Sequence, residues 1–269
     1  MIYKNDDILN FENISCGLGT SYIGKNIIHF HTIDSTNNYA KSIANNVLEG
    51  TIVISEEQSS GRGRLGKKWT SKAYEGIWMS LILKPNISLN KLSFLTILTS
   101  VSIARALDNL NVKVGIKWPN DIILNSKKLC GILTELCLDL ENKNFVVIGI
   151  GINVKSLDFD DDINKIATSL YKEGYILERK DIVREFLIEF EKNYTDYINT
   201  GNKANIIDLY KQYSVILNKN IFIVNNNEKE LVKCVDIDLD GNLIVKDLNN
   251  NIKSIATGEI SIRGENGYI

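Results

Sequence analysis

Residues 61–69 read Gly-Arg-Gly-Arg-Leu-Gly-Lys-Lys-Trp, so that four cations and three glycines follow a strand-like run at 51–55. Glycine lets a backbone curl closely around a ligand and present its N–H groups to it. Arginine and lysine neutralise phosphate or carboxylate, arginine as a planar fork and lysine as a point charge. The segment therefore favours a loop that closes over an anion, although a solvated basic turn or a nucleic-acid-binding segment would have the same composition.

A second chemically dense segment is Lys117-Trp118-Pro119-Asn120-Asp121, which combines a cation, an aromatic ring, a rigid proline and a carboxylate. Because proline interrupts a strand ladder, we expect a bulge or strand end here. Such an interruption would turn the neighbouring side chains into a cleft. A simple kink in an edge strand is the alternative interpretation.

Two further segments place glycine beside groups that could bind a ligand. Lys128 begins an otherwise apolar run, and Gly131 follows three residues later, which indicates the close approach of a ligand or, alternatively, a solvated strand start. The sequence Gly-Ile-Gly-Ile-Asn at 149–153 differs from a dinucleotide fingerprint, because Val154 replaces the third glycine and no helix is predicted to follow. We expect these glycines to let a ligand lie against the strand and the Asn153 amide to read a base edge.

Composition restricts the class of protein. The 269 residues suffice for one large domain and a small one, and a net charge of −2 with a pI of about 5.8 argues against a general nucleic-acid binder. Four cysteines without CxxC spacing and only two histidines leave little material for a histidine zinc site or a Ser-His-Asp triad. The N-terminus lacks an apolar signal core, and no apolar run approaches the ~20 residues of a membrane span. These features predict a cytoplasmic protein with free thiols.

Hydrophobic periodicity predicts the elements that must position these residues. Strands are predicted at 26–33, 51–55, 76–83, 114–124, 128–138 and 145–154, and helices at 34–47, at 91–110 and from about 183 to Gly201. A hairpin turn is predicted at 125–127. Beyond about residue 215, short β-rich runs alternate with Asn-rich or Asp-Gly turns. We therefore expect an α+β catalytic domain at 1–214 and a small β-barrel domain at 215–269.

In order and spacing, the segments at 34–37, 58, 61–66, 117–121, 128–133 and 149–153 resemble the motifs of biotin–protein ligases, and 258–263 resembles that family's closing segment. The resemblance covers nearly the whole chain. It implies a mixed sheet packed with helices, as in the class II synthetase-like catalytic domain of biotin and lipoate ligases, and a C-terminal SH3-like barrel. It also implies ATP-dependent activation of biotin to biotinyl-5′-AMP, followed by transfer to one lysine of a biotin carboxyl carrier domain of a biotin-dependent carboxylase.

The resemblance also implies a role for individual residues. The implied biotin site contains Ser35, Thr36, Asn37, Gln58, Gly61, Arg62, Gly63, Arg64, Trp69, Lys128 and Gly131. The implied ATP and adenylate site contains Arg64, Lys67, Trp69, Lys117, Asn120, Lys128, Asn153 and Arg263. The implied catalytic residues are Lys128, Arg62, Arg64 and Asp121, the last of which would orient or deprotonate the acceptor lysine. Mg²⁺ would arrive with ATP, so we expect no metal-ligating residues.

The physical demand of this chemistry is to bring a carboxylate against an anionic α-phosphate. Two negative charges ~4 Å apart repel by about 4 kcal/mol at an effective dielectric of about 20. The cations at 62, 64, 67 and 128 are suited to offset that repulsion.

Some members of the family carry an N-terminal helix-turn-helix domain and repress transcription. Only about 25 residues precede the first predicted strand, so we expect a ligase without repressor function and without a DNA or membrane partner. An exposed sheet edge would allow a homodimer or receive the carrier. The competing hypotheses are a lipoate or octanoate ligase, whose pocket should be more apolar and lack the Gly-Arg-Gly-Arg loop, and a non-catalytic nucleotide- or RNA-binding module.

Overall fold

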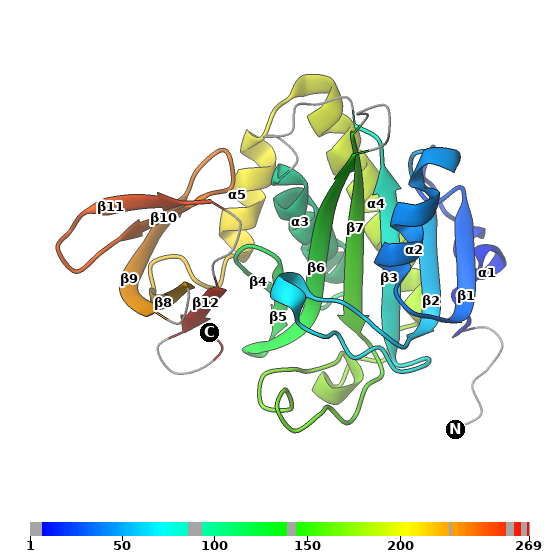
Figure 1. Ribbon diagram of the computed structural model, residues 1–269, viewed down its shortest axis with the longest axis horizontal. Helices are drawn as coiled ribbons and strands as arrows, with labels where there is room; N and C mark the ends of the chain where they lie inside the picture. Colours follow the sequence, from blue (N-terminus) through cyan, green and yellow to red (C-terminus); the bar gives the residue numbers. More distant parts are fainter. Residues whose placement is uncertain are drawn as a thin grey trace.

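A seven-stranded mixed sheet forms the body of the protein (Figure 1). The computed structural model describes residues 7–85, 93–138, 144–225, 228–256, 261–264 and 268. The strand order is β1 (Ile27–Ile33), β2 (Ile52–Gln58), β3 (Gly76–Leu83), β7 (Asn144–Asn153), β6 (Lys127–Leu138), β5 (Asp121–Leu124) and β4 (Gly115–Lys117). Only β1 and β2 pair in parallel; the other neighbouring strands of this sheet are antiparallel.

Helices cover both faces of this sheet (Figure 1). The main apolar core lies beneath α3 (Phe94–Asn109) and α4 (Arg179–Thr200), with α1 (Phe11–Ser15) and α5 (Ala204–Tyr213) beside them. A smaller core joins α2 (Thr36–Ile43) to the opposite face. Short 3₁₀ turns, η2 (Ala44–Asn46), η3 (Arg64–Gly66) and η5 (Tyr171–Glu173), complete the helical elements of the described ranges. Within those ranges, every helix is too short or too polar to span a bilayer.

The alternation of side chains along β7 separates the core from the site. Ile148, Ile150 and Ile152 are buried in the main core. Because successive strand residues face opposite sides of a sheet, the intervening positions Gly149, Gly151 and Asn153 lie on the α2 face. The Gly-Ile-Gly-Ile-Asn pattern is therefore a strand with one apolar face and one nearly bare face.

A second, antiparallel sheet follows in the chain. Its order is β11 (Ile252–Ile255), β10 (Leu243–Lys246), β9 (Glu228–Ile237), β8 (Asn220–Asn225) and β12 (Ser261–Gly264). It lies beside the β4–β5 end of the larger sheet (Figure 1), where the Trp118 indole donates a hydrogen bond to the Gly241 carbonyl at 2.8 Å. Apolar side chains from both sheets meet in the main core. The division into domains at residues 214 and 215 stays a prediction.

Most predicted elements are confirmed, but one predicted strand is divided and the structure contains elements that were not predicted. The single strand predicted at 114–124 is wrong: β4 and β5 are separate, because Pro119 interrupts the ladder and residues 118–120 form a turn. The helices α1 and α5 were not predicted. The hairpin turn is confirmed, since Asn125 and Ser126 both adopt positive φ, as a two-residue turn requires. Residues 258–260 of the predicted closing segment and the first two residues of the predicted helix at 91–110 lie outside the described residues.

Candidate active site

A cavity of about 240 Å³ opens on the α2 face of the large sheet. Of all the residues predicted to act in binding or catalysis, only Gly61 does not line it. The others are Ser35, Thr36, Asn37, Gln58, Arg62, Gly63, Arg64, Lys67, Trp69, Lys117, Asn120, Asp121, Lys128, Gly131, Asn153 and Arg263. Residues from both ends of the chain thus meet in one cavity.

One side of the cavity is a neutral, hydrogen-bonded surface, which we call the polar floor: Ser35, Thr36, Asn37 and Gln58. Thr36 donates through its backbone N–H (2.9 Å) and its hydroxyl (3.1 Å) to Gln58 Oε1. The Gln58 amide in turn donates to the Ser71 hydroxyl at 2.8 Å. Because Thr36 begins α2 and Gln58 ends β2, these contacts fix a helix start against a strand end.

A second group of hydrogen bonds connects the polar floor to β3 and β6. The Ser80 hydroxyl lies 2.8 Å from Thr36 Oγ1 and 2.5 Å from Asn37 Oδ1, and the Asn37 amide donates to Glu135 Oε2 at 2.9 Å. Ser80 is fully buried in β3. The sequence held a signal for it, because this serine is the one hydroxyl in the apolar run at 76–83.

The basic loop at 61–69 is closed at its base. The Trp69 N–H donates to the Gly61 carbonyl at 2.9 Å, and the Gly63 N–H donates to the Lys67 carbonyl at 2.7 Å. A Cβ at Gly61 would lie 2.2 Å from the Trp69 carbonyl oxygen, so only glycine fits there. Gly61 therefore shapes the loop without lining the cavity.

The Trp69 indole lies over a glycine pair. Gly131 of β6 and Gly151 of β7 face each other, and a Cβ on either would lie within 3 Å of the indole: 2.9 Å at Gly131 and 2.5 Å at Gly151. Lys128 Nζ lies 5.3 Å from the ring centroid, within cation–π range. The space that we expected a ligand to occupy against β7 is here taken by Trp69. Its Nε1 is buried without a hydrogen-bond partner among the described residues, which leaves a donor for a ligand.

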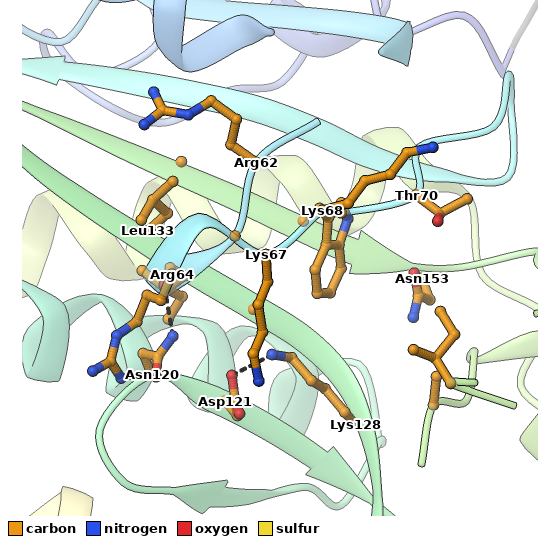
Figure 2. A pocket seen from close by; sticks show the side chains of 18 of the residues that line it. Arg62, Arg64, Lys67, Lys68, Thr70, Asn120, Asp121, Lys128, Leu133 and Asn153 are labelled. Atoms are coloured by element: carbon orange, nitrogen blue, oxygen red, sulfur yellow. Dashed lines mark hydrogen bonds and ion pairs between the residues drawn. The ribbon is translucent and has the colours of Figure 1, made fainter. Parts of the chain in front are cut away.

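The other side of the cavity, across β3, β7 and β6 from the polar floor, concentrates positive charge. We call this group the cation cluster: Arg64, Lys67, Lys117, Lys128 and Arg263. Figure 2 shows the amino groups of Lys67 and Lys128 beside the Asp121 carboxylate. Lys128 Nζ pairs with Asp121 Oδ1 at 2.6 Å, and Arg64 donates to Asn120 Oδ1 at 2.7 Å. Five cations around the Asp121 carboxylate leave an excess of positive charge, which suits a polyanionic ligand.

The pKa values of the cluster lysines reflect their burial and the neighbouring positive charges. Burial lowers the pKa of Lys117 to about 7; Asp121 opposes that shift, while Arg263, Lys128 and Lys67 add to it. Burial and the nearby Arg263 and Lys128 lower the pKa of Lys67 as well. For Asp121, burial alone would raise the pKa, but Lys128, the Tyr268 hydrogen bond and the charge of Lys117 together outweigh it, and the pKa is lowered. The cluster thus favours binding of negative charge.

Comparison with known proteins agrees with this geometry. Residues 29–153 match the model of the Biotin/lipoate A/B protein ligase family. The chain is 36% identical over 266 residues to the bifunctional ligase/repressor BirA of Bacillus subtilis, covering 97% of this chain and 81% of that protein. The chain belongs to the biotin/lipoate A/B protein ligase family.

Relatives of known structure share the fold. The biotin protein ligase from Aquifex aeolicus, solved in complex with biotin and ATP, aligns with a TM-score of 0.77 and 30% identity, covering 90% of this chain and all of that one. The biotin--[acetyl-CoA-carboxylase] ligase of Mycobacterium tuberculosis is 26% identical over 220 residues, 79% of each chain. The predicted fold class, a mixed sheet packed with helices and followed by a small β unit, is confirmed.

Within the ligase site, Arg62 lies apart from the cation cluster. Its guanidinium donates to Asn38 Oδ1 at 2.9 Å and pairs with Glu135 Oε1 at 3.2 Å. Figure 2 shows the side chain directed away from Lys67 and Asp121. The predicted contact of Arg62 with carboxylate or phosphate therefore stays a prediction and would require the loop to move.

Sequence analysis missed one wall of the ligase site. Ser156, Asp158, Phe159, Asp160, Ile163, Ile166 and Ala167 line the cavity. This segment is attached to Lys128, whose N–H donates to the Ile166 carbonyl at 2.7 Å and whose carbonyl accepts from the Thr168 N–H at 2.9 Å. The side-chain amide of Asn153, which is predicted to bind adenine, donates a hydrogen bond to the Thr168 carbonyl at 3.0 Å. The wall has no periodicity, so the sequence offered no signal for it.

Proposed function

We propose that this biotin protein ligase acts in two steps, forming biotinyl-5′-AMP from biotin and Mg-ATP and then transferring the biotinyl group to one lysine of a biotin carboxyl carrier domain. The observation that carries the proposal is the division of one cavity into a neutral polar floor and a cation cluster. A molecule that fits both has a polar ring that an acyl chain joins to a phosphate group. Biotinyl-5′-AMP has that form.

In the first step, a carboxylate oxygen of biotin attacks the α-phosphorus of ATP, and the bond to pyrophosphate breaks. In this proposal Lys128 contacts both the carboxylate and the α-phosphate, and Arg64, Lys67 and Arg263, which line the same cavity, supply further positive charge. Such fixed cations stabilise charge that develops in the transition state. Mg²⁺ enters with ATP as part of the substrate; within the described ranges no three His, Cys, Asp or Glu side chains gather to hold a metal.

In the second step, the amine of the acceptor lysine attacks the carbonyl carbon of the mixed anhydride. An amide bond forms, and AMP leaves with the electron pair of the broken C–O bond. The ammonium of the acceptor lysine must lose a proton before its nitrogen can attack, and in this proposal the proton goes to Asp121, the carboxylate that pairs with Lys128. Trp69 and the basic loop would cover the adenylate and keep water from it.

The polar floor favours biotin over lipoate or octanoate. The ureido ring of biotin offers N–H donors and a carbonyl acceptor, which Thr36 and Gln58 can bind once their mutual hydrogen bonds open. An apolar chain or dithiolane ring offers no such donors or acceptor, so Thr36 and Gln58 would keep their hydrogen bonds to each other and gain nothing from that ligand. The lipoate or octanoate alternative is therefore an outcome for the experiment to decide.

The remaining predictions concern the setting of the reaction. We propose a cytoplasmic ligase without repressor function, without a DNA or membrane partner, and with the carrier domain as its protein substrate. A homodimer formed through an exposed sheet edge stays a prediction. Specific binding of operator DNA by this chain would contradict the absence of repressor function.

Incubation of the chain with biotin, Mg-ATP and a biotin carboxyl carrier domain tests the proposal. The expected result is the mass gain of one biotinyl group on one lysine of the carrier, dependent on ATP. A parallel reaction with lipoate or octanoate and a lipoyl domain decides the alternative. No mass gain on either carrier would contradict both ligase functions.

A further inference from the structure

Tyr268 from the C-terminal end of the chain reaches into the cavity beside the cation cluster. Its hydroxyl donates a short hydrogen bond to Asp121 Oδ2, across 147 residues of sequence. Lys117 Nζ lies 3.4 Å from the centroid of its ring and donates to its carbonyl oxygen at 2.5 Å. Arg263 lies 5.8 Å from the same ring. No sequence motif pointed to this tyrosine.

These contacts engage both oxygens of Asp121. Oδ1 pairs with Lys128 at 2.6 Å, Oδ2 accepts from Tyr268, and the Asp121 side chain is only 15% exposed. Burial and the neighbouring Asp121 raise the pKa of Tyr268, so the phenol stays a neutral donor. An acceptor lysine that approaches Oδ2 of Asp121 therefore meets the Tyr268 hydroxyl there.

We propose that Tyr268 occupies the place of the acceptor lysine and must leave Asp121 before the carrier can react. This inference rests on the proposed transfer function and on the role of Asp121 within it. The tyrosine offers Asp121 the same kind of contact that the incoming amine would make, one polar hydrogen donated to Oδ2. Its ring also covers Lys117 and thereby narrows the approach to the cluster.

Competition of this kind has a defined kinetic signature. When only a fraction of the enzyme is binding-competent, the apparent affinity for the ligand falls by that fraction. Removing the hydroxyl weakens the occupied state and raises the competent fraction. The KM for the carrier should therefore fall, whereas kcat should not. A tyrosine that instead positioned Asp121 for catalysis would show a lower kcat when its hydroxyl is removed.

The test uses the full chain, preformed biotinyl-5′-AMP and a biotin carboxyl carrier domain at varied concentration. Tyr268→Phe should lower the KM for the carrier about tenfold without lowering kcat, because a hydrogen bond to a charged group has a strength of that order. Tyr268→Ala, which also uncovers Lys117, should lower it at least as far. Tyr213→Phe is the matched control, since it removes a tyrosine contact to Asp108 away from the cavity.

Three outcomes would overturn the inference: an unchanged KM for the carrier, a raised KM, or a lowered kcat in Tyr268→Phe. Each is read against wild-type enzyme that transfers normally, so it leaves the proposed function intact. Failure of the wild-type chain to transfer biotin from preformed biotinyl-5′-AMP would contradict the proposed function itself, and the inference with it.

Discussion

The polar floor and the cation cluster differ in how their side chains interact before a ligand binds. In the floor, Thr36, Gln58 and Ser71 satisfy one another through hydrogen bonds of 2.8–3.1 Å, without net charge. In the cluster, neighbouring cations help lower the pKa values of Lys67 and Lys117, so these side chains repel one another. The floor presents neutral donors and acceptors in a fixed arrangement. In the cluster, the cations repel one another, and a bound polyanion would offset that repulsion.

This difference predicts which binding or reaction step each region affects. Loss of a floor residue should weaken biotin binding and leave ATP binding nearly unchanged. Loss of a cluster residue should affect the steps in which phosphate takes part. Variants in each region can therefore break or sharpen the comparison.

The largest effect is expected from Lys128→Ala. It removes the cation that pairs with Asp121 and that we propose contacts the reacting carboxylate and phosphate, so adenylate formation should fall by more than about 10²-fold. Pyrophosphate release in the presence of biotin and ATP measures it. Lys127→Ala, one residue earlier in β6 and outside the cavity lining, is the matched control. An adenylation rate in Lys128→Ala near that of the control would show that the phosphate lies elsewhere.

Gln58→Leu should raise the KM for biotin about tenfold to a hundredfold. The substitution removes an amide from the floor and leaves the Thr36 N–H and hydroxyl without their acceptor. The KM for ATP should change by no more than about twofold. Steady-state pyrophosphate release at varied biotin and ATP measures both constants, with the exposed Gln212→Leu as control. Equal changes in the two constants would remove the distinction between the regions.

Arg64→Ala should speed the release of biotinyl-5′-AMP about tenfold, since one charge-assisted contact to the intermediate is lost. Arg62→Ala should have a smaller effect, because Arg62 is engaged by Glu135 and Asn38. Release is followed as the loss of intermediate from preloaded enzyme during dilution. If the two variants release equally fast, the loop must bring Arg62 to the ligand when it closes.

The last prediction concerns pH. The pKa of Lys117 is about 7, so its positive charge is present below that pH and is lost as the pH rises through it. ATP affinity should therefore fall about tenfold between pH 6 and pH 8, and binding at pH 8 should take up a proton. Calorimetry in two buffers of different ionisation enthalpy measures the uptake. Lys117→Arg, which keeps its charge, should remove the pH dependence; persistence of the full dependence would assign it to another group.

The site was predictable from sequence to the extent that it is local. Glycines at 149 and 151 alternate with core isoleucines, and Pro119 ends a strand beside Lys117 and Asp121, so the pattern itself shows where side chains leave the core. The contacts that sequence could not predict join distant residues. Arg62 meets Glu135 across 73 positions and Tyr268 meets Asp121 across 147. No periodicity or spacing encodes such pairs, which depend on the packing of the whole chain.

Biotin-dependent exchange of labelled pyrophosphate into ATP tests the central claim most directly, because it reports the reversible formation of an adenylate without any carrier. The account predicts exchange by the wild-type chain that requires biotin, is not supported by lipoate or octanoate, and is lost in Lys128→Ala. Exchange without biotin, or equal exchange with lipoate, would contradict the assignment of the polar floor to the biotin ring and of the cation cluster to the phosphate of biotinyl-5′-AMP.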